Sequence, residues 1–151
     1  MELREFIVEA KKSTYANVGE AGERELFEGA REFTFEKEEF RYRDRYYGFD
    51  PFSGQEVVWL RERPQWVMNY YGGTKSREVP PKKAFEFLKN ALKLVDAEKP
   101  FRGPAHYKEG PLDYYCESIG SVEEFTGLEK ITFRNSKVYD LSFHGGLVSR
   151  T

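Results

Sequence analysis

The sequence predicts an α+β fold: two repeats of one unit, each a helix followed by antiparallel strands, related by a pseudo-two-fold axis. The main observation is an internal repeat, because residues 52–73 and 125–146 align without a gap. The segments upstream of both match at a nearly constant offset. We therefore expect a tandem duplication within a single domain, residues 1–151, with halves near residues 1–78 and 79–151.

A helix is expected at the start of each half, over residues 2–12 and 82–97. The second helix is the better marked, because Pro80 and Pro81 precede it, as prolines do at a helix start. Apolar residues then recur at helical spacing and predict one buried stripe, made by Phe85, Leu88, Leu92 and Val95.

Strands follow each helix. A strand pair is expected over residues 33–47 and again over 105–119, because Phe40, Tyr42 and Tyr46 alternate with charged residues. A hairpin is expected over residues 56–71 and again over 129–144.

The hairpins need a particular register to bury their apolar residues on one face. A two-residue turn would place the apolar sets of the two strands on opposite faces. An odd-length loop or a bulge would place them together, and we expect the odd loop, around Arg63 and Ser136. Glu56 and Glu129 then lie on the buried side.

The outer faces of the two hairpins differ in character under this register. The first carries Val57, Trp59, Val67 and Tyr71, whereas the second carries Lys130, Thr132, Arg134, Asp140, Ser142 and His144. We therefore expect the first half to be covered on both sides or to line a pocket.

Composition excludes several protein classes. No stretch approaches the roughly 18 apolar residues of a membrane span, and acidic Glu2 and Glu5 stand where a secretory signal would be basic and apolar. One cysteine and two histidines make disulfides and metal sites poor expectations. The net charge of −2 does not indicate a polyanion partner. Arginines alternate with tyrosines over residues 41–46, but the neighbouring acids favour a solvated strand face over nucleic-acid binding.

These observations predict a cytoplasmic protein with no cofactor, no metal, no membrane partner and no directly bound nucleic acid. A homodimer stays open. Many glutamates and lysines with few Gln, Asn and Cys residues are a thermophile-like composition.

Four motifs carry a resemblance to a known family. FSGQEVVW at residues 52–59, WVMNYYG at 66–72, FRGP at 101–104 and HGG at 144–146 resemble an uncharacterised domain-of-unknown-function family of bacteria and archaea. In that family the domain occurs alone or behind an Xre-type helix-turn-helix, a segment not expected here. The resemblance supplies no catalytic residues and implies an effector-sensing or binding domain.

The repeated carboxylates Glu56 and Glu129 have two interpretations. They could act as an acid and base pair or hold a cation. Alternatively, each could pair with an arginine such as Arg61 or Arg102, which is the default because a buried carboxylate needs a partner. The loop that carries Arg102 could equally hold an anionic ligand or pair with a core glutamate.

A catalytic triad is not expected. Asp140, Ser142 and His144 share one strand face, but alternate strand residues point in parallel, roughly 6–7 Å apart. No Gly-x-Ser-x-Gly elbow accompanies them.

A ligand cavity is expected between the two halves, lined by Trp66, Asn69 and Tyr71, with Glu56 and Arg102 nearby. Asn69 lies among aromatic residues on a strand, where asparagine is disfavoured, so its amide should have a specific partner. The complete set of candidate ligand-binding residues is Glu56, Trp66, Asn69, Tyr71, Arg102, Glu129 and His144.

The sequence thus leaves two hypotheses about function. The first is a small-molecule-binding or sensor/regulatory module. The alternative is a small hydrolase-like enzyme that uses the repeated carboxylates together with His144. No recognised nucleophile, metal or phosphate motif is present, which favours the binding module and argues against an enzyme. Two glutamates facing one shared cleft would favour the enzyme, whereas separate burial against arginines would favour a structural role.

Overall fold

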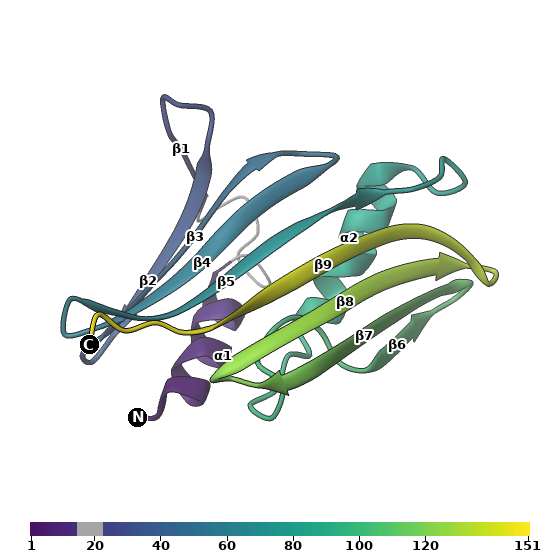
Figure 1. The fold of residues 1–151 in the computed structure, drawn as a ribbon. Coiled ribbons are helices and arrows are strands. Elements are labelled where there is room, and N and C mark those ends of the chain that lie inside the picture. Colours follow the sequence, from purple (N-terminus) through teal and green to yellow (C-terminus); the bar gives the residue numbers. More distant parts are fainter. Residues whose placement is uncertain (15–22) are drawn as a thin grey trace.

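A computed structural model describes residues 1–14 and 23–151 of the chain (Figure 1). The described residues form one nine-stranded antiparallel sheet in the order β1-β2-β3-β4-β5-β9-β8-β7-β6. Its strands are β1 (Arg24–Glu25), β2 (Arg31–Lys37), β3 (Phe40–Gly48), β4 (Phe52–Leu60), β5 (Arg63–Thr74), β6 (His106–Glu109), β7 (Leu112–Ser121), β8 (Glu124–Phe133) and β9 (Ser136–Leu147). The two helices, α1 (Leu3–Ser13) and α2 (Pro81–Leu92), lie behind the sheet in Figure 1 and leave its other face open. The α+β class with antiparallel strands is confirmed.

The helices begin where the sequence predicts them, but α2 is shorter. It ends at Leu92 rather than near residue 97. The N–H groups of Leu94 and Val95 bond to carbonyls only three residues back, those of Ala91 and Leu92. The chain tightens at this point and buries Val95 against the core.

The hairpin register is set by bulges and not by odd-length loops. Each turn has two residues with positive φ: Arg61 (51°) and Glu62 (67°), then Arg134 (48°) and Asn135 (70°). Each hairpin also contains a bulge, where the strand register shifts: after Val58 in the first hairpin and after Ile131 in the second. The expected odd loop is therefore wrong. The expected shared face is confirmed, because the bulge restores the parity that the two-residue turn would invert.

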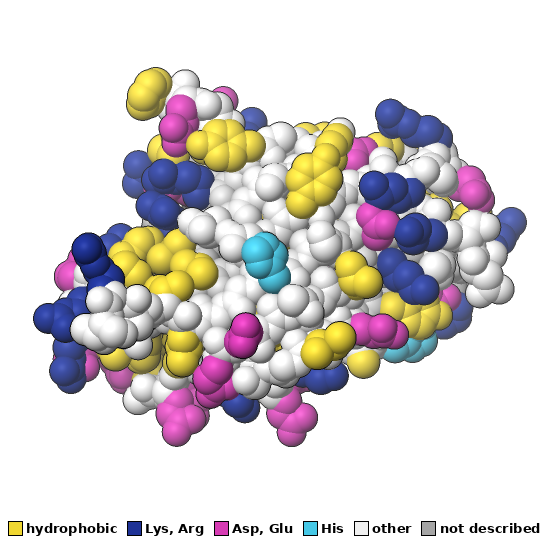
Figure 2. All heavy atoms as spheres, viewed as in Figure 1, with side chains coloured by type: hydrophobic (Ala, Val, Ile, Leu, Met, Phe, Trp, Pro, Cys, Tyr) yellow, Lys and Arg dark blue, Asp and Glu magenta, His cyan; other side chains and the backbone are white. Residues whose placement is uncertain are grey.

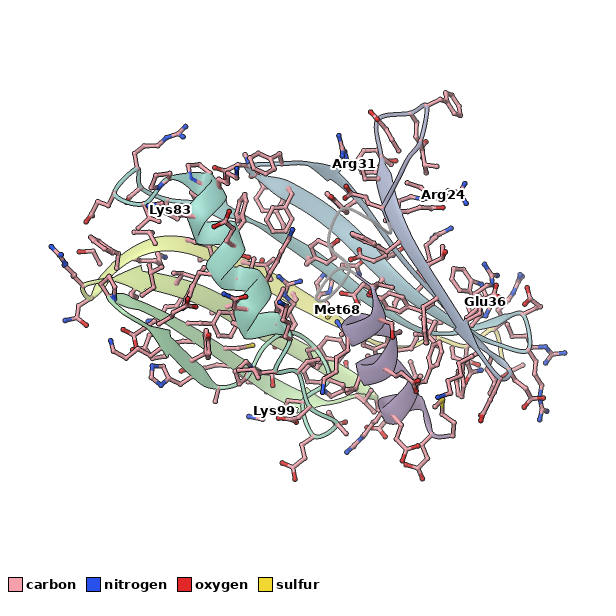
Figure 3. All side chains as sticks on the ribbon, turned by 180° about the vertical axis from the view of Figure 1, so that it is seen from behind. Arg24, Arg31, Glu36, Met68, Lys83 and Lys99 are labelled. Atoms are coloured by element: carbon pink, nitrogen blue, oxygen red, sulfur yellow. The ribbon has the colours of Figure 1, made fainter. Side chains whose placement is uncertain are left out.

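The core lies between the sheet and the two helices. Tyr42, Trp66, Met68 and Ile131 are fully buried there. Figure 3, which views the helix side, shows Met68 on the sheet between the two helices. Side chains of even-numbered residues on β3, on β4 and, from Trp66 onwards, on β5 point into this layer, because strand residues alternate between faces.

On the open face of the sheet, arginines of β3 lie over Trp59 of the first half. Arg41 is the direct cross-strand partner of Trp59, and its guanidinium lies 4.1 Å from the centre of the Trp59 ring. Arg43 lies 5.2 Å from the same ring, and its cross-strand partner Val57 is only 6% exposed. Cation–π contacts therefore shield Trp59, whereas Tyr71 on the same face is 55% exposed.

Candidate functional site

Five charged side chains meet in the layer between the sheet and the helices. Each is at most 4% exposed, which is unusual for charged residues. They come from α1, β3, β4, the loop before β6, and β8: Lys11, Asp44, Glu56, Arg102 and Glu129. We call this set the buried charge cluster.

Glu129 is the most completely bonded member of the cluster. Arg102 donates to it twice, from Nε to Oε2 at 3.0 Å and from Nη2 to Oε1 at 2.9 Å. The hydroxyls of Tyr114 (2.5 Å) and Tyr139 (2.7 Å) also donate to it. Bidentate geometry with two further donors satisfies a buried carboxylate, so Glu129 has a structural partner set.

The Arg102 loop approaches Tyr114 so closely that only glycine fits beside it. The N–H of Gly103 donates to the Tyr114 hydroxyl at 2.8 Å. A Cβ at Gly103 would lie 2.7 Å from the Tyr114 ring. The FRGP motif therefore holds Arg102 in place over Glu129.

Glu56 is paired with Lys11 of α1. The Lys11 ammonium lies 2.7 Å from Oε1, and the Tyr42 hydroxyl donates to the same oxygen at 2.7 Å. Lys11 also donates to the Phe101 carbonyl at 2.5 Å. Burial lowers the pKa of Lys11, and the charge of Glu56 opposes this. Glu56 Oε2 has no hydrogen-bond partner among the described residues.

Asp44 is the third carboxyl group and differs from the other two. Its cross-strand neighbours on the same face are Phe33 of β2 and Glu56 of β4. The Tyr70 hydroxyl donates to Oδ1 at 2.5 Å. Burial, followed by the nearby charge of Glu56, raises the pKa of Asp44 to about 7. The two cations of the buried charge cluster pair with the other two carboxylates, Lys11 with Glu56 and Arg102 with Glu129.

A pocket opens directly beside Asp44. Its volume is about 340 Å³, and we call it the Asp44 pocket. It lies between α2 and the first strands of the sheet. Most of its wall is apolar, and among its polar lining groups are Asp44, Tyr70 and Arg102; the apolar residues are Phe33, Phe49, Phe52, Phe85 and Leu88. An apolar cavity with a few convergent polar groups is the usual form of a small-molecule site.

The structure divides the candidate residues between the two faces of the sheet. Glu56, Trp66, Arg102 and Glu129 lie on the helix side, where Trp66 donates to the Val122 carbonyl at 3.1 Å and stacks on Phe125. The open face carries the other three: Asn69, Tyr71 and His144.

These two groups do not form one cavity. Residues 66 and 69 of β5 have opposite parity, so their side chains point to opposite faces. Asn69 is the direct partner of His144 and accepts a hydrogen bond from Gln55 at 2.9 Å, which is the specific partner expected for its amide. Tyr71 is 55% exposed. Of the seven candidates, Arg102 is the one that lines the Asp44 pocket.

Figure 2 shows the open face. A histidine side chain lies near its middle, and charged side chains gather towards its edges. The residues of the hydrolase alternative therefore do not converge, since His144 lies on this face and both glutamates lie on the other. The glutamates also do not share the Asp44 pocket, because each is buried against its own cation.

Sequence reasoning missed Asp44 and Lys11. Asp44 lies between Tyr42 and Tyr46 at the same strand parity, so the alternation already placed a carboxyl group on the apolar face. Lys11 follows Ile7 by four residues, on the buried side of α1. A charged residue in register with an apolar stripe was the available signal in both places.

The described residues contain neither a metal-binding cluster nor a membrane-spanning helix. No group of three or more His, Cys, Asp or Glu side chains is arranged to hold a metal ion within residues 1–14 and 23–151. None of the helices in the same part of the chain is long and apolar enough to cross a membrane.

Comparison with known proteins identifies one family. A family model for a domain of unknown function, DUF5680, matches residues 44–148. The matched range begins at Asp44 and includes Glu56, Arg102 and Glu129, whereas α1 and β2 precede it. No curated protein and no solved structure matches the chain.

Proposed function

The chain belongs to the DUF5680 family, a domain of unknown function, and we propose that it is a small-molecule-binding module whose ligand lies in the Asp44 pocket. The observation that carries this proposal is a carboxyl group, 3% exposed and without a salt bridge to any described residue, beside an apolar cavity of about 340 Å³. Burying such a group is costly unless it has a partner. A buried carboxyl group that lines a pocket and has a raised pKa is the kind of group that marks a functional site.

A sensor or regulatory role would follow from the position of the pocket. Its lining comes from β2, β3, β4 and β5 of the sheet, from the loop that carries Arg102, and from α2 across from the sheet. A ligand held there would contact both layers and would stabilise their packing. Ligand binding would then change the stability of the packing between α2 and the sheet, and this change would be the signal.

We also propose that the single domain arose by tandem duplication. Matching details in the two halves support this. Tyr42 bonds to Glu56 as Tyr114 bonds to Glu129. A Cβ at Gly54 would meet the Tyr70 side chain, just as one at Gly127 would meet that of Phe143. The two hairpins also share their turns and bulges. We also propose a cytoplasmic location, in which the single buried thiol of Cys116 would stay reduced.

A thermal-shift screen against a metabolite library tests the binding proposal. A compound that binds only the folded chain raises its melting temperature. Three proteins are compared: wild type, Phe85→Ala in the pocket wall, and His144→Ala on the open face as a matched control. At least one compound should stabilise wild type and His144→Ala but not Phe85→Ala. A library without stabilising compounds, or hits that Phe85→Ala retains in full, would contradict the proposal.

A further inference from the structure

The buried charge cluster has one more acid than it has cations. Lys11 is committed to Glu56 at 2.7 Å, and Arg102 is committed to Glu129 through two hydrogen bonds. Asp44 remains, with a tyrosine hydroxyl as its one described side-chain donor. Buried charges are normally paired with an opposite charge. No described residue forms a salt bridge with Asp44, so an ionised Asp44 would need a positive partner from outside this set.

The aromatic wall of the Asp44 pocket also favours a positively charged ligand. Aromatic rings present electron-rich faces, which attract cations and repel anions. Phe85 lies edge-on to Phe49, with ring centres 5.1 Å apart, and edge-on to Phe52 at 5.9 Å. Tyr46 and Phe33 complete the aromatic lining next to Asp44. Phe49 is 66% exposed and forms an apolar rim.

We propose that the ligand of the Asp44 pocket is an organic cation: a protonated amine on a flat apolar body, with its N–H groups donating to the Asp44 carboxylate. The inference rests on the proposed function, because it names the chemical class that the same pocket takes. The ammonium supplies the missing positive charge of the cluster, and the apolar body fills the aromatic wall.

The other charged groups around the pocket leave this assignment in place. Arg31, on β2 (Figure 3), pairs with Glu23 at 3.1 Å, so these two neutralise each other. Arg102 faces the pocket with its charge balanced by Glu129. Lys89 of α2 also lines the pocket and is half-buried, but it forms no ion pair with Asp44, to which Tyr70 is the described side-chain donor. Asp44 itself is 3% exposed, so water screens its attraction to a nearby cation only weakly, and this attraction opposes the cost of removing the cation from water.

A pair of probes with opposite charge tests the inference. Tryptamine carries an ammonium on an indole ring, and indole-3-propionate carries a carboxylate on the same ring. Their affinities are measured by isothermal titration calorimetry against wild type, Asp44→Asn and Asp140→Asn. The last variant makes the same chemical change on the open face. Folding of each variant is checked by circular dichroism.

Tryptamine should bind wild type at least about tenfold more tightly than indole-3-propionate, the factor that one charge-assisted contact supplies. Asp44→Asn should remove that preference, and Asp140→Asn should keep it. No measurable tryptamine binding, equal affinity for the two probes, or a preference that survives in Asp44→Asn would overturn the inference. Indole-3-propionate that binds wild type more tightly than tryptamine does, and that loses this binding in Phe85→Ala, would overturn the charge class yet leave the proposed function standing.

A second measurement on wild type serves if Asp44→Asn does not fold. The groups that face Asp44 are Glu56 on β4, Tyr70 on β5, Lys11 on α1 and Arg102 before β6, with Lys89 on α2 across the pocket. Since a cation selects the ionised carboxyl group, tryptamine affinity should rise from pH 6 to pH 8. A constant or falling affinity over this range would contradict the assignment.

Discussion

Replacing Asp44 with asparagine should change how stability depends on pH. Asparagine has nearly the shape of a protonated aspartic acid but cannot ionise. In wild type the folded chain raises the pKa of Asp44 from 3.8 to about 7, first through burial and then through the charge of Glu56. Between these values the folded state keeps a proton that the unfolded state has released. The free energy of unfolding of wild type therefore falls as pH rises through this window.

The magnitude follows from the two pKa values. At about 1.4 kcal/mol for each pH unit, raising the pKa from 3.8 to about 7 corresponds to a loss of up to about 4 kcal/mol. Asp44→Asn removes the titration of Asp44 and its interaction with Glu56, so the difference between variant and wild type reports these two effects together. The variant should gain on wild type by up to that amount between pH 4 and pH 8.

Urea unfolding at a series of pH values measures this difference. Trp66 is fully buried, so its fluorescence reports the loss of the core. Linear extrapolation gives the free energy of unfolding for each protein at each pH. A difference between variant and wild type that stays constant from pH 4 to pH 8 would refute the argument that Asp44 is buried in protonated form at acid pH.

Three further predictions concern the surroundings of the pocket. Glu129→Gln should lower the free energy of unfolding by about 3–5 kcal/mol, because it leaves Arg102 buried without its counter-ion; a loss below 1 kcal/mol in urea unfolding would contradict this pairing. Burial raises the pKa of Cys116 to about 12, so its thiol in the folded chain should react with iodoacetamide at pH 8 about a thousandfold more slowly than in urea. Equal rates, read by mass spectrometry, would show the opposite. Gly54→Ala would place a Cβ close to the Tyr70 hydroxyl and should cost about 1–3 kcal/mol, whereas an unchanged melting temperature would mean that the ring moves freely.

Periodicity and burial were sufficient to predict the elements and their faces. The apolar sets on both strands of each hairpin had to share one side, and the structure places Val58 directly opposite Trp66. The device that achieves this was not predictable from apolar pattern alone. A bulge and an odd loop give the same parity, and the choice depends on the positive-φ turn at Arg61 and Glu62.

The candidate site was predicted less well, for two physical reasons. The expected cavity combined Trp66 with Asn69, although an odd separation on a strand already assigns them to opposite faces. The Asp44 pocket, by contrast, depends on where α2 packs across the sheet. Apolar periodicity along the chain predicts which face of α2 is buried but not its position on the sheet. Pairing was the more reliable argument, since a buried carboxylate requires a partner wherever it lies. Arg102 with Glu129 follows from that rule.

The Asp44 pocket, and not the open face, should bind an organic cation. Chemical-shift mapping of the ¹⁵N-labelled chain, with saturating tryptamine, tests this most directly. The largest amide shifts should cluster on β2, β3, the loop after β3 and α2, around Phe33, Asp44, Phe49 and Phe85. Shifts that instead cluster on the open face around Asn69, Tyr71 and His144, or an unchanged spectrum, would contradict it.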